Sequence, residues 1–170
     1  MSTRIGSPRR GQIIVVDGVP ERLEVASTFG ADEFVDLREL PQPEQRITRV
    51  KELTGGWGAD AVTELAGFPQ VTHEGVQMVG SGGRYVEIGN ISPGLTYDAD
   101  PAFWVTQNVT IYGNNLYGRH HLRDALDIVR RTRHKYPFDR IVSHKFPLEE
   151  VNEALAAQDE GHITRASLVP

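Results

Sequence analysis

Residues 12–20 read QIIVVDGVP, and this stretch decides the expected fold. The four consecutive β-branched residues 13–16 are typical of a strand that is buried on both faces, as in a parallel sheet. Asp17 ends the strand, and Pro20 suits the first position of a helix. Apolar residues then follow at helical spacing as far as Gly30, which ends the helix. The stretch therefore predicts a βα unit that begins near residue 12.

Strands and helices alternate along the rest of the chain. Further strands are expected over 33–37, 60–65, 84–88, 109–113, 140–146 and 166–169. Helices are expected over 44–53, 70–80, 119–133 and 147–158, with Gly161 ending the last one. The glycine-rich residues 80–83 are expected to form a turn. The alternation predicts an α/β fold with a Rossmann-like, doubly wound parallel sheet. Ligand sites of such sheets lie beyond the carboxyl ends of the strands, here in the loops that begin at Asp17, Ala66, Gly89 and Asn114.

Composition excludes several classes of protein. The 170 residues include 18 Lys and Arg against 23 Asp and Glu, so the chain lacks the basic footprint of a nucleic-acid binder. Its longest aliphatic run, 13–16, is far too short to span a bilayer, and no apolar segment follows Met1 as in a secretory signal. The sequence contains no cysteine, which excludes disulfides and cysteine zinc sites and favours a cytoplasmic location. No nucleic-acid or membrane partner is therefore expected.

Asp17 is the first candidate for a binding role. At the end of such a strand, an acid accepts hydrogen bonds from the adenosine ribose hydroxyls of a dinucleotide and repels the 2′-phosphate of NADP. The alternative is an acid that caps the following helix near Val19. A glycine-rich phosphate loop should precede such an acid by about 20 residues, yet only 16 residues come before Asp17 and they show no such pattern. The sequence thus predicts NAD as the cofactor, with binding weak or lost in this chain.

Several segments carry a family resemblance when they are taken in order. They are Val16-Asp17 with PERLE at 20–24 and FGAD at 29–32, LTGGWGAD at 53–60 with Glu64 and Gly67, GGRYV at 82–86 with Ile88-Gly89, and FPLEEVNEAL at 146–155. Together they resemble the coenzyme-binding part of zinc-containing alcohol dehydrogenases of the medium-chain dehydrogenase/reductase family. The resemblance covers residues 12–170. It implies the C-terminal portion of an enzyme that transfers hydride between NAD and an alcohol or carbonyl compound.

The resemblance also implies which residues contact each part of NAD. These are Asp17 and Arg22 beside the adenosine ribose, Ala66 and Phe68 against adenine, Ile88, Gly89 and Asn90 on the nicotinamide side, Asn114 and Leu116 near the carboxamide, and Arg165 on the phosphates. Arginine forms strong charge-assisted hydrogen bonds with phosphate. A solvated surface arginine is the alternative for both Arg22 and Arg165.

The sequence departs from the family pattern at the zinc sites and at the first βα unit. In the family a zinc-bearing catalytic domain comes first, and neither it nor the phosphate-loop unit has a counterpart here. No catalytic residue and no metal ligand is therefore assigned, and the chain is not expected to be active alone, since no Lewis acid polarises the substrate oxygen. Two alternatives stay open, namely a non-catalytic remnant that serves as an oligomerisation or interaction module, and a zinc-free reductase of the same superfamily.

The expected domains are a flexible tail at 1–11, a partial dinucleotide-binding domain at 12–134 and a segment of the catalytic domain at 135–170. Dimers of the family extend their sheet through the sixth strand, so we expect a homo-oligomer through the edge at 109–113, with a missing N-terminal half as a further partner. The missing βα unit supplies the central strand of the sheet. Strand 12–17 is therefore expected to pair with strand 60–65 or with another chain, because unpaired strand edges are costly.

Overall fold

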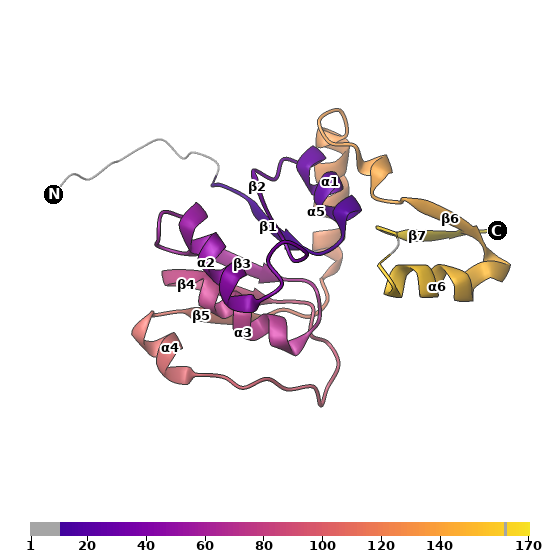
Figure 1. Cartoon of the computed structure of the whole chain (residues 1–170). Coiled ribbons are helices and arrows are strands. Elements are labelled where there is room, and N and C mark those ends of the chain that lie inside the picture. Colours follow the sequence, from indigo (N-terminus) through magenta and orange to yellow (C-terminus); the bar gives the residue numbers. More distant parts are fainter. Residues whose placement is uncertain (1–10, 162) are drawn as a thin grey trace. The chain divides into compact units, whose positions relative to one another are not determined.

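The computed structural model describes residues 11–161 and 163–170 (Figure 1). The predicted flexible tail, except for Gly11, lies outside the described residues. Contacts divide the chain into two units, one formed by residues 11–36 with 132–170 and the other by residues 37–131. This division rests on contacts alone, so the predicted domain boundary between residues 134 and 135 remains a prediction.

The second unit holds a three-stranded parallel sheet. Its strands are β3 (Ala59–Glu64), β4 (Val79–Glu87) and β5 (Thr110–Gly113), with β4 in the middle as Figure 1 shows. The register sets Glu64 opposite Glu87 and Glu87 opposite Gly113. Because the strands are parallel, these carboxyl ends meet at one edge of the sheet, which is where ligands bind in such folds.

The second unit also contains the helices α2 (Pro43–Leu53), α3 (Pro69–Met78), α4 (Pro101–Thr106) and, up to Arg131, α5 (Arg119–Thr132). The first three begin with proline, which suits the first helical position because its N–H would have no partner there. Helix α3 packs against β3, β4 and α2. The Tyr85 ring is fully buried against Val76 and Val79, so it forms the centre of the core of this unit.

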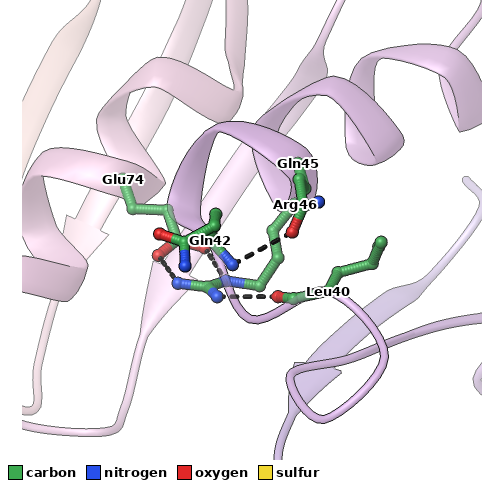
Figure 2. A network of polar contacts seen from close by, with 5 residues as sticks. All are labelled: Leu40, Gln42, Gln45, Arg46 and Glu74. Atoms are coloured by element: carbon green, nitrogen blue, oxygen red, sulfur yellow. Dashed lines mark hydrogen bonds and ion pairs between the residues drawn. The ribbon is translucent and has the colours of Figure 1, made fainter.

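A buried ion pair joins α2 to α3. Arg46 Nε and Nη2 donate to the two carboxylate oxygens of Glu74, each at 2.6 Å, and Nη1 donates to the Leu40 carbonyl at 2.8 Å (Figure 2). The Gln42 N–H donates to Gln45 Oε1 at 3.1 Å and so closes the first turn of α2. Because a bidentate arginine–carboxylate pair is geometrically specific, these contacts fix where α2 begins and how it lies on α3.

Residues 80–83 belong to β4, so the predicted turn there is wrong. Ala59 pairs with Val79 and Ala61 with Arg84, which leaves the glycine-rich residues as an irregular, bulged part of the strand. A Cβ on Gly58 would lie only 2.7 Å from the Gly80 nitrogen, and φ of Gly58 is +83°. The two backbones can approach this closely because both residues are glycine.

The first unit holds two short parallel sheets, β1 (Ile14–Asp17) with β2 (Glu33–Asp36), and β6 (His144–Pro147) with β7 (Ala166–Val169). Helix α1 (Pro20–Thr28) connects the first pair, and α6 (Val151–Asp159), after the 3-10 helix η2 (Leu148–Glu150), connects the second. Gly30 and Gly161 have φ values of 91° and 74°. These left-handed residues confirm that glycine ends both helices as predicted.

Two other predicted segments differ from the structure. The strand expected at 140–146 is present as β6, but its predicted start is wrong, since Phe138–Arg140 form a 3-10 helix, η1, and β6 begins only at His144. Phe138 packs edge-on against Phe29, with ring centroids 5.4 Å apart, and this contact favours a compact turn over an extended strand. The expected loop between residues 89 and 109 contains α4, whose first turn is capped by Asp100 Oδ1 accepting the Ala102 N–H at 3.0 Å.

The α/β class and the parallel pairing of the strands are confirmed. The sheets are β1-β2, β3-β4-β5 and β6-β7, and no ladder joins β1 to β3 among the residues that the structure describes. Direct pairing of the strands predicted at 12–17 and 60–65 is therefore not observed. Pairing of β1 with another chain stays a prediction.

Candidate functional site

Strands β3 and β4 each end on a glutamate. Glu64 is almost completely buried, and its Oε1 accepts the Gly67 N–H at 2.6 Å. Its Oε2 accepts the Gly89 N–H at 3.1 Å and the Asn90 side-chain Nδ2 at 3.4 Å. A single carboxyl group therefore binds the loop that follows β3 and the loop that follows β4.

Glu87 is held by a second set of donors. Its Oε2 accepts the hydroxyls of Thr72 at 2.8 Å and Tyr85 at 3.2 Å, and its Oε1 accepts the backbone N–H and Nδ2 of Asn90 at 3.2 and 3.1 Å. Asn90 Nδ2 thus faces both glutamates, while its Oδ1 is buried with no hydrogen-bond partner in the described part of the chain. We name these five residues, Glu64, Thr72, Tyr85, Glu87 and Asn90, the carboxylate cluster.

The two glutamates of the carboxylate cluster titrate differently. Burial and the neighbouring Glu87 raise the pKa of Glu64, and the Gly67 N–H opposes this rise. Burial by itself also raises the pKa of Glu87, but hydrogen bonds from Glu64, Thr72 and Asn90 outweigh burial and lower the pKa to about 2. A proton that enters the cluster therefore resides on Glu64, and Glu87 carries the negative charge.

The loops after β3 and β4 touch through two glycines. A Cβ on Gly67, whose φ is +81°, would lie 2.8 Å from the Gly89 carbonyl oxygen. A Cβ on Gly89 would lie 2.5 Å both from Glu64 Oε2 and from the Gly67 nitrogen. No side chain fits at either position without moving backbone atoms, so the two loops can lie this close together only because both residues are glycine.

Seven of the predicted cofactor residues lie in the loops at this edge. They are Ala66 and Phe68 after β3, Ile88, Gly89 and Asn90 after β4, and Asn114 and Leu116 after β5. The Asn114 N–H donates to the Glu87 carbonyl at 2.9 Å, which brings the third loop to the same edge. Phe68 and Leu116 are 64% and 78% exposed, so both have apolar surface free to pack on a ligand. Their contact with NAD stays a prediction.

The other three predicted residues lie in the first unit. Asp17 Oδ1 accepts the Val19 N–H at 2.8 Å in a local turn just before α1, whose first turn no side chain caps, and Oδ2 lies 4.0 Å from Arg22 Nη1. The structure thus brings Asp17 and Arg22 together. Arg165 is exposed and lies just before β7, where its backbone N–H donates to Ser143 Oγ at 3.2 Å. Ribose binding by Asp17 and phosphate binding by Arg165 remain predictions.

Sequence reasoning did not single out Glu64 and Glu87 as site residues. The signal was present, because each glutamate ends a strand and is followed within three residues by a glycine, Gly67 or Gly89. Thr72 and Tyr85 had no such signal. The Thr72 hydroxyl reaches Glu87 only through the packing of α3 on β4, which is a property of the tertiary fold. Tyr85 instead lies two residues before Glu87 on the same strand, so both side chains share one face of the sheet.

The described residues lack both a group of metal ligands and a membrane-spanning helix. Within residues 11–161 and 163–170, no three His, Asp or Glu side chains come together in a group that could hold a metal ion. Among the same residues, no helix combines the length and the apolar character needed to cross a membrane.

The chain was compared with known proteins. A family model described as zinc-binding dehydrogenase matches residues 9–131. The chain is 31% identical over 153 residues to 5-exo-hydroxycamphor dehydrogenase of Pseudomonas putida, a match that covers 90% of this chain and 42% of that protein. It is 30% identical over 169 residues to erythritol/L-threitol dehydrogenase of Mycolicibacterium smegmatis, covering 96% of this chain and 43% of that protein. The chain therefore spans less than half the length of these relatives.

The fold has solved counterparts as well. An alcohol dehydrogenase from Thermotoga maritima matches with a TM-score of 0.82 and 28% identity, over 94% of this chain and 43% of that one. A zinc-binding domain protein of the alcohol dehydrogenase type from Burkholderia ambifaria matches with a TM-score of 0.77 and 29% identity, over 94% and 42%. Sequence segments, parallel sheet and comparisons agree, and the chain belongs to the zinc-binding dehydrogenase family.

Proposed function

We propose that this chain is the NAD-binding portion of a zinc-type alcohol dehydrogenase, and that it is not active on its own. The whole enzyme would transfer hydride between NAD and an alcohol or a carbonyl compound. NAD, when bound, supplies the hydride acceptor. The residues of this chain bind and orient the cofactor, and the part of the enzyme beyond this chain activates the substrate oxygen.

The observation that carries this proposal is the shared edge at the carboxyl ends of β3, β4 and β5. Three loops meet there, and Glu64 and Glu87 hold the first two in place. Gly67 and Gly89 let the first two loops lie against each other, which gives this edge a fixed geometry. Parallel α/β sheets bind their ligands at this edge.

The residues present fit parts of NAD and do not fit zinc. Asp17 Oδ2 is not used by the Val19 N–H and remains available to a ribose hydroxyl, with Arg22 beside it. The exposed Phe68 offers an apolar face for a base. For zinc, the sequence has no cysteine, and the described residues contain no group of three ligands, so we derive no step through a metal in this chain.

Calorimetric titration with NAD and NADP tests the proposal. Asp17→Asn keeps an oxygen for the Val19 N–H but removes the charge that repels a 2′-phosphate. We therefore expect about tenfold weaker NAD binding and a reduced preference for NAD over NADP. Asp98→Ala, which removes an exposed carboxylate from a loop, serves as the control and should change neither value. Tight NADP binding by the unaltered chain, or an unchanged NAD affinity in Asp17→Asn, would contradict the role of Asp17.

A second candidate function, an oligomerisation module, is favoured by the edge strand β5. All four residues of β5 are exposed, and in the described part of the chain the strand pairs only with β4. We propose that a second copy of the chain pairs with this edge. Sedimentation at high concentration should show a species larger than the 18.9 kDa chain, and Ile111→Lys should reduce it. No binding of either dinucleotide, together with a stable dimer, would favour this module over the NAD-binding portion.

A further inference from the structure

We propose that Glu64 is a positioning residue: its side chain holds the loops after β3 and β4 at the spacing that the cofactor requires. The inference rests on the proposed NAD-binding function and goes beyond it. It assigns a role to a side chain that lies beneath the binding surface and was not among the predicted contacts.

Glu64 reaches both loops from one position. Its Oε1 is committed to the Gly67 N–H at 2.6 Å, and its Oε2 to the Gly89 N–H at 3.1 Å. The Gly89 N–H also approaches the Glu64 backbone carbonyl, at 3.2 Å. The side chain and the main chain of one residue therefore determine where Gly67 and Gly89 lie relative to each other.

The two loops leave little freedom for another spacing. Gly67 and Gly89 approach so closely that a Cβ on Gly67 would lie 2.8 Å from the Gly89 carbonyl oxygen. Phe68, Ile88 and Asn90, which flank these glycines, are predicted to face the cofactor. A shift of either glycine therefore moves the predicted contact residues with it.

The surroundings of Glu64 differ from those of a stabilising ion pair. Glu74 in the same unit is equally buried, at 6% against 4% exposed, and Arg46 neutralises it. No ion pair joins Glu64 to a cation in the described part of the chain, and a second glutamate, Glu87, interacts with it. Burying two carboxyl groups side by side is costly for stability. The cost is understandable if the acceptors are needed to hold loops in a fixed geometry.

Substitutions at Glu64 separate this role from a structural one. Glu64→Gln keeps one oxygen but presents an NH₂ group to either Gly67 or Gly89, and Glu64→Leu removes both acceptors. Glu74→Gln is the matched control, because it alters an equally buried glutamate that contacts neither loop. All three substitutions are made in the full chain. For each variant, calorimetry measures the affinity for NAD, and NMR measures amide hydrogen exchange at Gly67 and Gly89.

We expect Glu64→Gln to weaken NAD binding and to accelerate exchange at Gly67 or Gly89, each by about tenfold, and Glu64→Leu to do so at both amides. Glu74→Gln should lower the unfolding midpoint without changing either quantity. Equal effects of Glu64→Gln and Glu74→Gln would overturn the proposal, since Glu64 would then act only through stability. If the unaltered chain binds no NAD, the proposed function itself fails. Faster exchange with unchanged NAD affinity would instead leave that function standing and refute the positioning role alone. Should Glu64→Leu not fold, Glu64→Gln suffices for each of these decisions.

Discussion

The Arg46–Glu74 ion pair provides the sharpest test of what stabilises the second unit. Arg46→Met removes two hydrogen bonds of 2.6 Å and leaves the Glu74 carboxylate, which is 6% exposed, without its cation. Breaking a buried pair in this way costs about 3–5 kcal/mol. The Leu40 carbonyl also loses its donor. Since domains have net stabilities of about 5–15 kcal/mol, this one change should remove about a fifth of the total or more.

A double-mutant cycle separates the ion pair from simple packing. Replacing both partners, as in Arg46→Met with Glu74→Met, removes the unpaired charge, and the double variant should be about as stable as the original chain or more stable. Arg49→Met is the control, because Arg49 and Glu52 form an exposed pair at 3.2 Å that should contribute less than about 1 kcal/mol. Urea unfolding followed by circular dichroism at pH 7 measures the original chain, the single variants Arg46→Met and Glu74→Met, the double variant and the control. The reasoning is refuted if Arg46→Met costs no more than Arg49→Met.

Three further predictions concern single positions. Gly58→Ala places a Cβ 2.7 Å from the Gly80 nitrogen at a φ of +83°. The unfolding free energy should therefore fall by about 2 kcal/mol and the melting temperature by several degrees. The control is Gly113→Ala, whose Cβ meets nothing within 4 Å, and it should change the melting temperature little. Leu116→Gly relieves a φ of 62° at a residue that is 78% exposed, and should raise the unfolding free energy by up to about 1 kcal/mol. Because the pKa of Glu87 is lowered from 4.5 to about 2, its stabilising contribution is complete above pH 4.5 and is lost as the pH falls toward 2. Urea midpoints across that window should decline less steeply in Glu87→Gln, and an identical decline would count against the assigned charge state.

The sequence predicted those parts of the fold that depend on local chemistry. Gly30 and Gly161 end helices because their φ values are positive, and the last strand, 166–169, has the predicted bounds. Residues 80–83 were misjudged because composition alone cannot distinguish a turn from a bulged strand that passes close to Gly58. Helix α4 was missed, although Asp100 followed by Pro101 is an ordinary start of a helix.

The candidate site, like the fold, was predictable from the sequence only in part. The strand ends that lead into the cofactor-facing loops could be located from the alternation of strands and helices. The carboxylate cluster could not, because its hydrogen bonds require the in-register pairing of Glu64 with Glu87 and the packing of α3 on β4. For Asp17 the local pattern fitted two roles, ribose binding and helix capping, and the structure shows only a turn contact to the Val19 N–H ahead of α1.

The close approach of glycines occurs near both ends of the β3–β4 pair, Gly58 with Gly80 at the start and Gly67 with Gly89 at the finish. Each strand therefore has a fixed length between two anchored points. An insertion of even one residue between Gly58 and Gly67 would pull one of these glycine pairs apart, whatever residue were chosen. Gly94 has open space around it. A tag, a protease site or a reporter domain introduced into this chain belongs there, where added length leaves the paired strands undisturbed.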